Sequence, residues 1–278
     1  LLLTVVCLLI LGPGIGTSPE IILFSVGQGE SILLRAAGKN LLIDGGGLRS
    51  DSFDVGERLL APALGRLGIK SLDAVILTHA HPDHSGGLGY IIENFDVGEF
   101  WSTSNVVDLP ADLSQLLLEN DVVIQKYDQV GWKKLSPGGL QSVSLFTASI
   151  VASTVNDRSL CLYYPTEAGG VLLTGDLEGR GVKALMATPL PGTVSLLKAP
   201  HHGSRRSNPQ RLLGELRPEV VMVSAGYENS YNFPAQELLE QARLLGIKVW
   251  RTDLDGTVRI RVAGRTWQVD QWKKGLFR

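Results

Sequence analysis

The stretch LTHAHPDHSGG, residues 77–87, decides how this chain is interpreted. It places three of the five histidines and one aspartate within six residues, directly after the apolar run LDAVI. Imidazole and carboxylate groups are the ligands expected for zinc, manganese or iron(II). Four such donors are more than one small ion usually takes from so short a segment. The pattern therefore predicts two ions, with His79 and His81 on one and Asp83 and His84 on the other.

Further donors follow two later apolar strands, where α/β folds place functional groups. Asp176 comes after VLLTG, and we expect it to bridge the ions; an aspartate that only caps a helix or turn is the alternative. His201 and His202 stand together in LLKAPHHGS, and one of them would complete the second site. We favour His202 as the ligand, which leaves His201 as a general acid or a donor to phosphate. Asp83 and His201 are therefore the catalytic candidates.

Composition excludes several classes of protein. The 278 residues allow one large domain or two small ones, with 44% hydrophobic and 19% charged residues. The net charge of −2 gives no overall field that would attract nucleic acid, so polyanion binding would need a local patch. The only cysteines, Cys7 and Cys161, lie in apolar runs, which argues against a disulfide framework and against a cysteine metal site.

The first residues, LLLTVVCLLILG, are almost entirely apolar. They are too few for a complete membrane span of roughly 20 residues, and they lack the basic start of a signal peptide. We interpret residues 1–14 as the end of a transmembrane helix of a longer parent chain. A buried strand or helix of the domain itself is the alternative. No low-complexity linker follows, so residues 19–278 are predicted to form one domain.

Apolar runs and turn residues predict two similar halves, each a hairpin followed by strand–loop–helix units. Ser207 or Asn208 would cap the helix that has Pro209 in its first turn. Helices are expected at 56–68, 113–120, 207–216 and 234–246; strands or hairpins are expected at 21–26, 31–36, 40–44, 72–78, 121–127, 159–176, 193–199, 220–225, 248–252 and 257–269.

Together these motifs carry a family resemblance. The order T-H-x-H-x-D-H-x-G-G and then T-G-D resembles the metallo-β-lactamase-fold hydrolases. The stretches SVGQGESILL, LLIDGGG, NDRSLCL, LLKAPHHGSRRSN and GIKVWRTDLDGTVRI are similar to the C-terminal domain of ComEC-type DNA-internalisation competence proteins. The matching stretches follow the order of that family and cover nearly all of the chain after residue 20.

The resemblance implies an α/β fold, an αββα sandwich of two mixed β-sheets flanked by helices, with the metals at the sheet edges. It implies that Asp44 accepts a hydrogen bond behind the metal ligands. Asn156 stands where many members of the superfamily supply another metal-binding histidine. The apolar start fits a domain that follows a membrane channel, on the outer face of the cytoplasmic membrane.

Two departures from the family pattern bear on activity. Ser25 and Glu30 stand at the two acidic positions of D-V-G-Q-G-D. Phe233, in YNFP, stands where the family has the histidine of Y-G-H-P. If that histidine positions the substrate or a proton, we expect turnover in this chain to be reduced or altered.

The favoured function is a phosphodiesterase or nuclease that uses two divalent ions, zinc or manganese, to trim a strand of DNA during import. Lys198, Ser204 and Arg205 surround the HHGS turn, and with Arg206 they are candidates for contacting phosphate or for supporting the ligands. A hydrolase for a phosphocholine ester, a cyclic nucleotide or a thioester is one alternative, because the same metal core serves them all. A metal-containing domain without activity is another. No obligate protein partner is indicated.

Overall fold

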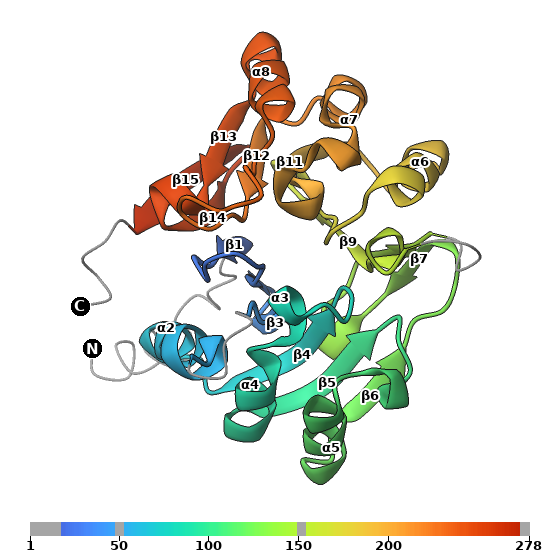
Figure 1. Ribbon diagram of the computed structural model, residues 1–278, viewed down its shortest axis with the longest axis vertical. Coiled ribbons are helices and arrows are strands. Elements are labelled where there is room, and N and C mark those ends of the chain that lie inside the picture. Colours follow the sequence, from blue (N-terminus) through green and yellow to red (C-terminus); the bar gives the residue numbers. More distant parts are fainter. Residues whose placement is uncertain (1–17, 48–52, 149–153, 273–278) are drawn as a thin grey trace, which may run out of the picture.

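The computed structural model describes residues 18–47, 53–148 and 154–272. Within these ranges the chain forms two β-sheets packed face to face, with helices on the outer side of each sheet (Figure 1). Both sheets contain parallel and antiparallel pairs, so the expected αββα sandwich of mixed sheets is confirmed. The expected membrane segment, residues 1–14, lies outside the described residues. Among those that are described, no helix has the length and apolar character needed to cross a membrane.

The first sheet contains both ends of the described chain. Its strand order is β15-β14-β1-β2-β3-β4-β5-β6, so the C-terminal hairpin pairs with the first strand. Its strands are β1 (Glu20–Leu23), β2 (Ile32–Ala36), β3 (Lys39–Ile43), β4 (Ser71–Leu77), β5 (Asp96–Ser102), β6 (Val123–Lys126), β14 (Thr257–Ala263) and β15 (Thr266–Trp272).

The second sheet has the strand order β13-β12-β11-β10-β9-β8-β7. Its first two strands along the chain, β7 and β8, form an antiparallel hairpin that the sequence patterns did not predict. The sequence patterns also missed β5 of the first sheet. The strands are β7 (Gly131–Leu135), β8 (Val143–Thr147), β9 (Cys161–Thr166), β10 (Gly169–Leu173), β11 (Val194–Lys198), β12 (Val220–Val223) and β13 (Lys248–Arg251).

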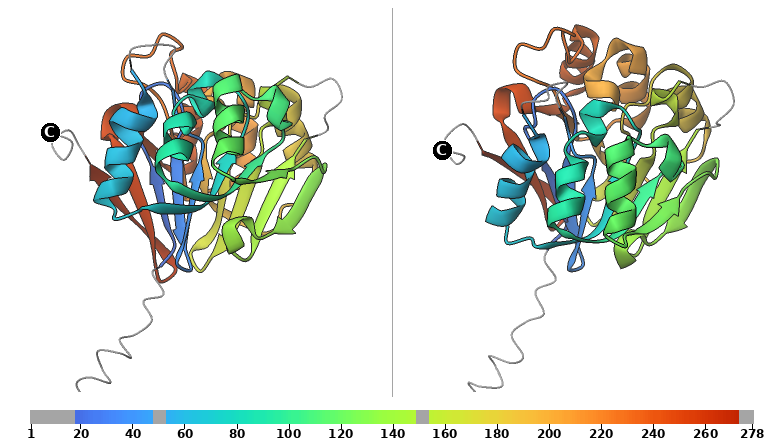
Figure 2. Two further views of the ribbon diagram at one scale, coloured as in Figure 1. Left: turned by 90° about the horizontal axis from the view of Figure 1, so that it is seen from below. Right: turned by 60° about the horizontal axis from the view of Figure 1, so that its bottom comes forward.

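The helices divide between the two outer faces, and Figure 2 shows the same layers from two further directions. On the first sheet lie a π-helical turn (Gly56–Leu60) that continues into α2 (Ala61–Arg66), α4 (Leu88–Asn94) and α5 (Ala111–Glu119). On the second sheet lie α6 (Gly179–Ala187), α7 (Pro209–Leu216) and α8 (Gln236–Leu245), and α9 (Thr252–Asp255) is a single turn before β14. Asn208 occupies the N-cap position of α7, one of the two residues predicted there, but its side chain makes no capping hydrogen bond.

Three apolar layers hold these elements together. Alternate residues of the strands face opposite sides, as the period of two requires. In β1, for example, Ile21 packs between the two sheets, whereas Ile22 packs under the helices of the first sheet. A third cluster joins the second sheet to its helices and includes the fully buried Cys161.

Strand direction decides where the functional loops lie. β1 and β3 both run antiparallel to β2, and β3 is parallel to β4, so β1, β3 and β4 end at the same edge. In the second sheet β10, β11 and β12 are parallel to one another and also share an edge. The metal donors predicted from the sequence lie in the loops after β4, β10 and β11, and Asp44 lies in the loop after β3.

Candidate metal centre

The turn after β4 holds four of the predicted donors. His79 and His81 follow the strand directly, and the short helix α3 (Pro82–Ser85) carries Asp83 and His84. Backbone N–H groups of His84 and Ser85 both donate to the carbonyl oxygen of His81, which closes the turn. Because the turn follows a fully packed strand, its side chains are held in fixed positions at the edge of the sheet.

The second sheet supplies its donors from the ends of β10 and β11. Asp176 follows β10, and His201 and His202 lie in a 3₁₀ turn (Pro200–Gly203) after β11. Both histidines have positive φ angles, 47° and 54°. This uncommon backbone conformation sends the two neighbouring side chains to different partners.

Asp83, His84, Asp176 and His202 converge on one point. Their ligand atoms lie within 4.8 Å of one another. Asp176 is central, because its Oδ1 lies 3.3 Å from Nε2 of His84 and its Oδ2 lies 3.4 Å from Nε2 of His202. Nε2 of His202 is also 3.4 Å from Oδ2 of Asp83. The turn of the first sheet and the strand ends of the second sheet therefore form one site.

The polar atoms of this cluster fit a divalent cation. Nε2 of His84, Oδ1 of Asp176 and Nε2 of His202 are buried, and none makes a hydrogen bond to another described residue. Buried polar atoms are normally paired, so three unpaired atoms that point at one another need an explanation. Two imidazoles and two carboxylates are a suitable ligand set for zinc, manganese or iron(II), and an ion between them would satisfy all three atoms.

His79 and His81 lie beside this cluster and have a separate geometry. Nε2 of His79 is 3.1 Å from Nδ1 of His81, and the rings of His79 and His84 have their centroids 4.1 Å apart. Asn156 is buried, and its Oδ1 has no hydrogen-bond partner among the described residues. Neither His79 nor His81 belongs to the four-residue cluster that the described residues form.

Two acceptors behind the cluster fix the orientation of its histidines. Oδ2 of Asp44 lies 2.7 Å from Nδ1 of His84, and Asp44 also accepts hydrogen bonds from the N–H and hydroxyl of Thr78. The carbonyl oxygen of Ser224 lies 2.9 Å from Nδ1 of His202. Each acceptor holds the proton on Nδ1, which leaves Nε2 free to bind a metal. Asp44 thus has the position that the family resemblance implied.

The carboxylates and imidazoles of this site shift one another's pKa values. Burial disfavours a charged His202, but Asp176 and Asp83 outweigh it and raise the pKa of His202 to about 9. Burial also opposes the charge on Asp176, yet His202 and His84 hold the pKa of Asp176 well below its usual range. The carboxylates therefore attract positive charge into the site, and a cation meets the same demand.

Removing the support behind His84 is expected to weaken metal binding. Asp44→Ala leaves Nδ1 of His84 and both donors of Thr78 without their acceptor, so the ring loses its fixed orientation. Loss of such a partner costs about 10- to 100-fold in metal affinity. Competition with a chromophoric chelator measures this change, and circular dichroism checks that the fold is kept. Wild-type affinity in a folded variant would contradict the role given to Asp44.

Comparison with known proteins decides the family. The sequence model of the metallo-β-lactamase superfamily matches residues 25–227, which include every member of the cluster. The chain belongs to this superfamily. Two solved structures agree in fold. The metallo-β-lactamase fold protein YhfI from Bacillus subtilis has a TM-score of 0.56 at 13% identity and covers 91% of this chain and all of that one. The metallo hydrolase Igni18 from Ignicoccus hospitalis has a TM-score of 0.56 at 17% identity and covers 88% of this chain and all of that one.

Curated proteins similar to this chain include ComEC-type competence proteins. ComE operon protein 3 of Bacillus subtilis is 32% identical over 94% of this chain and 35% of its own length. Competence protein ComA of Neisseria gonorrhoeae is 26% identical over 85% of this chain and 31% of its own length. The chain thus spans about a third of the curated relatives it matches. They confirm the resemblance that VGQGE and PHHGS indicated.

His201 takes no part in the four-residue cluster of this metallo-β-lactamase domain. Its Nδ1 is 2.9 Å from Oε2 of Glu178, and its Nε2 is 3.8 Å from Oδ2 of Asp176. The side chain is 18% exposed, whereas that of His202 is 1% exposed. The carboxylate of Glu178 therefore holds the ring of His201, which is partly exposed beside the cluster. Glu178 was missed in the sequence, although it stands only two residues after Asp176.

Lys198 supports the metallo-β-lactamase site from behind. It is fully buried, forms an ion pair with the buried Glu30 and donates to the carbonyl oxygen of Gly175 at 2.9 Å. Its Nζ lies 3.6 Å from Oδ1 of Asp176. Of the two roles expected for Lys198, contacting phosphate or supporting the ligands, only the second fits an ammonium group that has no access to solvent.

Ser204 and Arg205 are neighbours in the sequence but differ in burial: Ser204 is buried, whereas Arg205 is exposed. The buried Oγ of Ser204 accepts the backbone N–H of Arg206 and so closes a turn, and the residue also lines a cavity with Arg205 and Arg206. The Arg205 side chain is 75% exposed and lies 3.3 Å from Glu237. Arg206 is equally open and lies 4.0 Å from Glu178. Exposed ion pairs of this kind are weak, so both guanidinium groups can turn to an anion.

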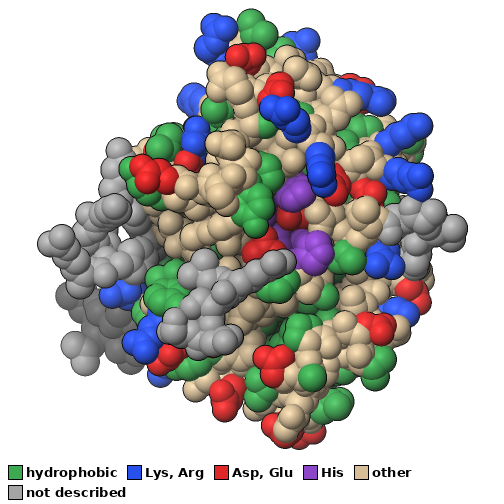
Figure 3. All heavy atoms as spheres, viewed as in Figure 1, with side chains coloured by type: hydrophobic (Ala, Val, Ile, Leu, Met, Phe, Trp, Pro, Cys, Tyr) green, Lys and Arg blue, Asp and Glu red, His purple; other side chains and the backbone are tan. Residues whose placement is uncertain are grey.

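A cavity of about 180 Å³ lies over the cluster. Figure 3 shows histidine side chains at the bottom of a hollow near the middle of this face, with Lys and Arg side chains above it and to its right. The ring of Phe233 borders the hollow, with its centroid 5.5 Å from that of His201 and 6.1 Å from that of His202. The residues that line the cavity are Gln28, His81, Pro82, Asp83, Asn156, Asp176, His201, His202, Tyr231 and Phe233.

Proposed function

We propose that this chain is a metal-dependent phosphodiesterase that cleaves a DNA strand during import. The observation that carries the proposal is the set of buried atoms without hydrogen-bond partners on His84, Asp176 and His202, the last two of which line a cavity near two exposed arginines. The competence proteins among its relatives favour DNA as the substrate. The proposal includes two zinc or manganese ions, with His79 and His81 holding the second.

Each group near the cluster has a part in this proposal. A divalent ion bound there would lower the pKa of a water molecule and offset negative charge on phosphoryl oxygens. Asp83, His84, Asp176 and His202 would hold the ion, and Asp83 also lines the cavity. His201, held by Glu178, stands at the wall of the same cavity and gives a proton to the leaving oxygen.

The proposal extends to the place of the domain in the cell. The resemblance to ComEC-type DNA-internalisation proteins favours a domain on the outer face of the cytoplasmic membrane, joined through its N-terminal segment to a channel. Reactivity of an engineered surface cysteine toward an impermeant reagent on intact cells tests this orientation. Labelling only after lysis would overturn it.

A metal-screened nuclease assay tests the proposed activity. The purified chain is given Mn²⁺ or Zn²⁺ and then linear single-stranded or duplex DNA. The matched control carries Asp83→Ala and His84→Ala, which remove two of the four ligands in the cluster. We expect metal-dependent cleavage in the wild type and none in the control.

Two other results would point away from this function. Hydrolysis of a phosphocholine ester or a cyclic nucleotide, with DNA left intact, would make the domain a hydrolase of small esters. Stoichiometric metal binding without turnover of any ester would make it a non-catalytic metal domain. Cleavage that survives in the Asp83→Ala His84→Ala control would show that a contaminating nuclease was measured.

A further inference from the structure

The loop between β12 and α8 carries a row of aromatic rings that begins at the metal cluster. The ring of Phe233 is inclined by 28° to that of His202, with centroids 6.1 Å apart. The ring of Tyr231 follows at 5.5 Å and is inclined by 15° to that of Phe233. Tyr231 is 64% exposed, so the outer ring of the row presents its surface to solvent.

A hydrogen-bonded asparagine holds this row in place. The side-chain amide of Asn229 donates to the carbonyl oxygen of Phe233 at 2.8 Å and to that of Gly226 at 3.0 Å. Its Oδ1 accepts the backbone N–H of Phe233 at 2.9 Å. The loop is therefore fixed before any ligand arrives, which lowers the entropy cost of binding.

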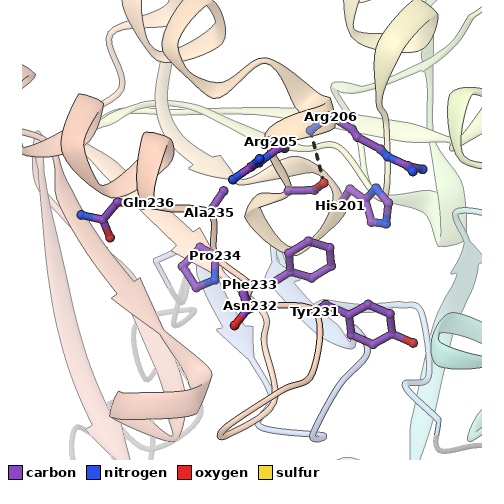
Figure 4. Close-up of a pocket in the computed structure, with 10 residues that line it drawn as sticks. His201, Arg205, Arg206, Tyr231, Asn232, Phe233, Pro234, Ala235 and Gln236 are labelled. Carbon is purple, nitrogen blue, oxygen red and sulfur yellow. Dashed lines mark hydrogen bonds between the residues drawn. The ribbon is translucent and has the colours of Figure 1, made fainter.

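The aromatic row joins two cavities. Tyr231, Phe233 and His201 line both the 180 Å³ cavity over the cluster and a neighbouring cavity of about 830 Å³. The larger cavity adds Arg205 and Arg206, and Figure 4 shows their side chains across from the Tyr231 and Phe233 rings. A flat apolar surface beside two exposed guanidinium groups is complementary to one class of ligand, a base joined to phosphates.

We propose that Tyr231 stacks on the base of the nucleotide next to the cleaved phosphodiester, while Arg205 and Arg206 bind phosphates farther along the same strand. This inference rests on the proposed function and deepens it by naming single-stranded DNA as the substrate. In a duplex both faces of each base are covered by neighbouring base pairs, so a base must leave the stack before Tyr231 can contact it. A small ester without a base could not stack on Tyr231, and it would lack the further phosphates that Arg205 and Arg206 would bind.

A binding experiment tests this without requiring turnover. The metal-free 278-residue chain is titrated into a short single-stranded oligodeoxynucleotide that carries 2-aminopurine, whose fluorescence falls when the base stacks on an aromatic ring. Aromatic stacking contributes enough affinity that Tyr231→Ala is expected to weaken binding by about 5- to 150-fold, whereas Tyr231→Phe keeps the wild-type affinity. Tyr227→Ala is the matched control, because this tyrosine is 69% exposed near the start of the same loop but lines neither cavity.

An abasic strand separates stacking from every other contact. When the fluorescent nucleotide is replaced by an abasic site, wild type and Tyr231→Ala should bind the strand equally, because the contact is missing in both. Equal binding of the 2-aminopurine strand by wild type and Tyr231→Ala would overturn the inference. So would duplex DNA binding as tightly as the single strand.

Failure of the inference and failure of the proposed function give different results. Cleavage of single-stranded DNA that is insensitive to Tyr231→Ala would leave a phosphodiesterase without the base contact. Binding that depends on Tyr231, with no cleavage under any metal, would keep the base contact and reject the phosphodiesterase.

Discussion

Replacing Asp176 by asparagine is expected to remove the metal and to lower turnover by about a thousandfold, since a catalytic ion supplies several kcal/mol of stabilisation to the transition state. Asp176 faces Nε2 of both His84 and His202, at 3.3 Å and 3.4 Å. The amide has nearly the same shape but no negative charge, and its NH₂ group would point a donor where a ligand is needed. Metal content by mass spectrometry and the rate of DNA cleavage measure the two effects.

Asp73→Asn is the matched control for this substitution. Asp73 is partly buried and accepts hydrogen bonds from Lys39 and from the backbone of Asn40, but it lies near the start of β4, at the end away from the metal turn. We expect this variant to keep its metal and its rate. Wild-type metal affinity in Asp176→Asn would show that the ions are held by other residues.

Lys198→Met is expected to lower the free energy of unfolding by about 3–5 kcal/mol, because it leaves a buried carboxylate without its cation. Glu30 and Lys198 are both fully buried and form an ion pair. Burial raises the pKa of Glu30, and the charge of Lys198 counteracts that rise. In the variant Glu30 takes up a proton, which limits but does not abolish the loss. Urea denaturation with a chelator present measures the difference without the contribution of bound metal.

A second substitution makes this prediction specific. Glu30→Gln together with Lys198→Met removes both charges, and it should restore most of the lost stability. The exposed pair Arg211–Glu215, 2.6 Å apart, is the control: Arg211→Met should cost less than about 1 kcal/mol. A double variant no more stable than Lys198→Met alone would show that the charge of Glu30 is not the cause.

The metal turn was predictable because its information is local. Four donors lie within six residues after one apolar strand, and the strand delivers them to the edge of a sheet. The information that decides whether His201 or His202 belongs to the metal cluster is not local in the sequence. Two left-handed residues separate their side chains, and the carbonyl of Ser224 and the carboxylate of Glu178 then receive one ring each. Those partners lie on other elements.

Burial explains the errors at other positions. In the sequence, Lys198 is a candidate for contacting phosphate, but in the fold it is buried and forms an ion pair with Glu30, which is distant along the chain.

The hairpin β7–β8 was missed because Lys133 and Lys134 interrupt the apolar alternation of β7. β7 is the last strand of its sheet, and charged side chains are common on such strands.

The direction of β1 has a practical consequence for handling this molecule. β1 begins at the edge away from the metal cluster, and the loop that follows it carries Gln28 and Glu30 to the side of the cluster. Any linker or solid support attached ahead of Ser18 therefore joins the molecule on the far side, separated from the cluster by the seven residues of β4, roughly 23 Å. A chain immobilised through that end should present its cavity to the solution, with room for a long polymer to pass.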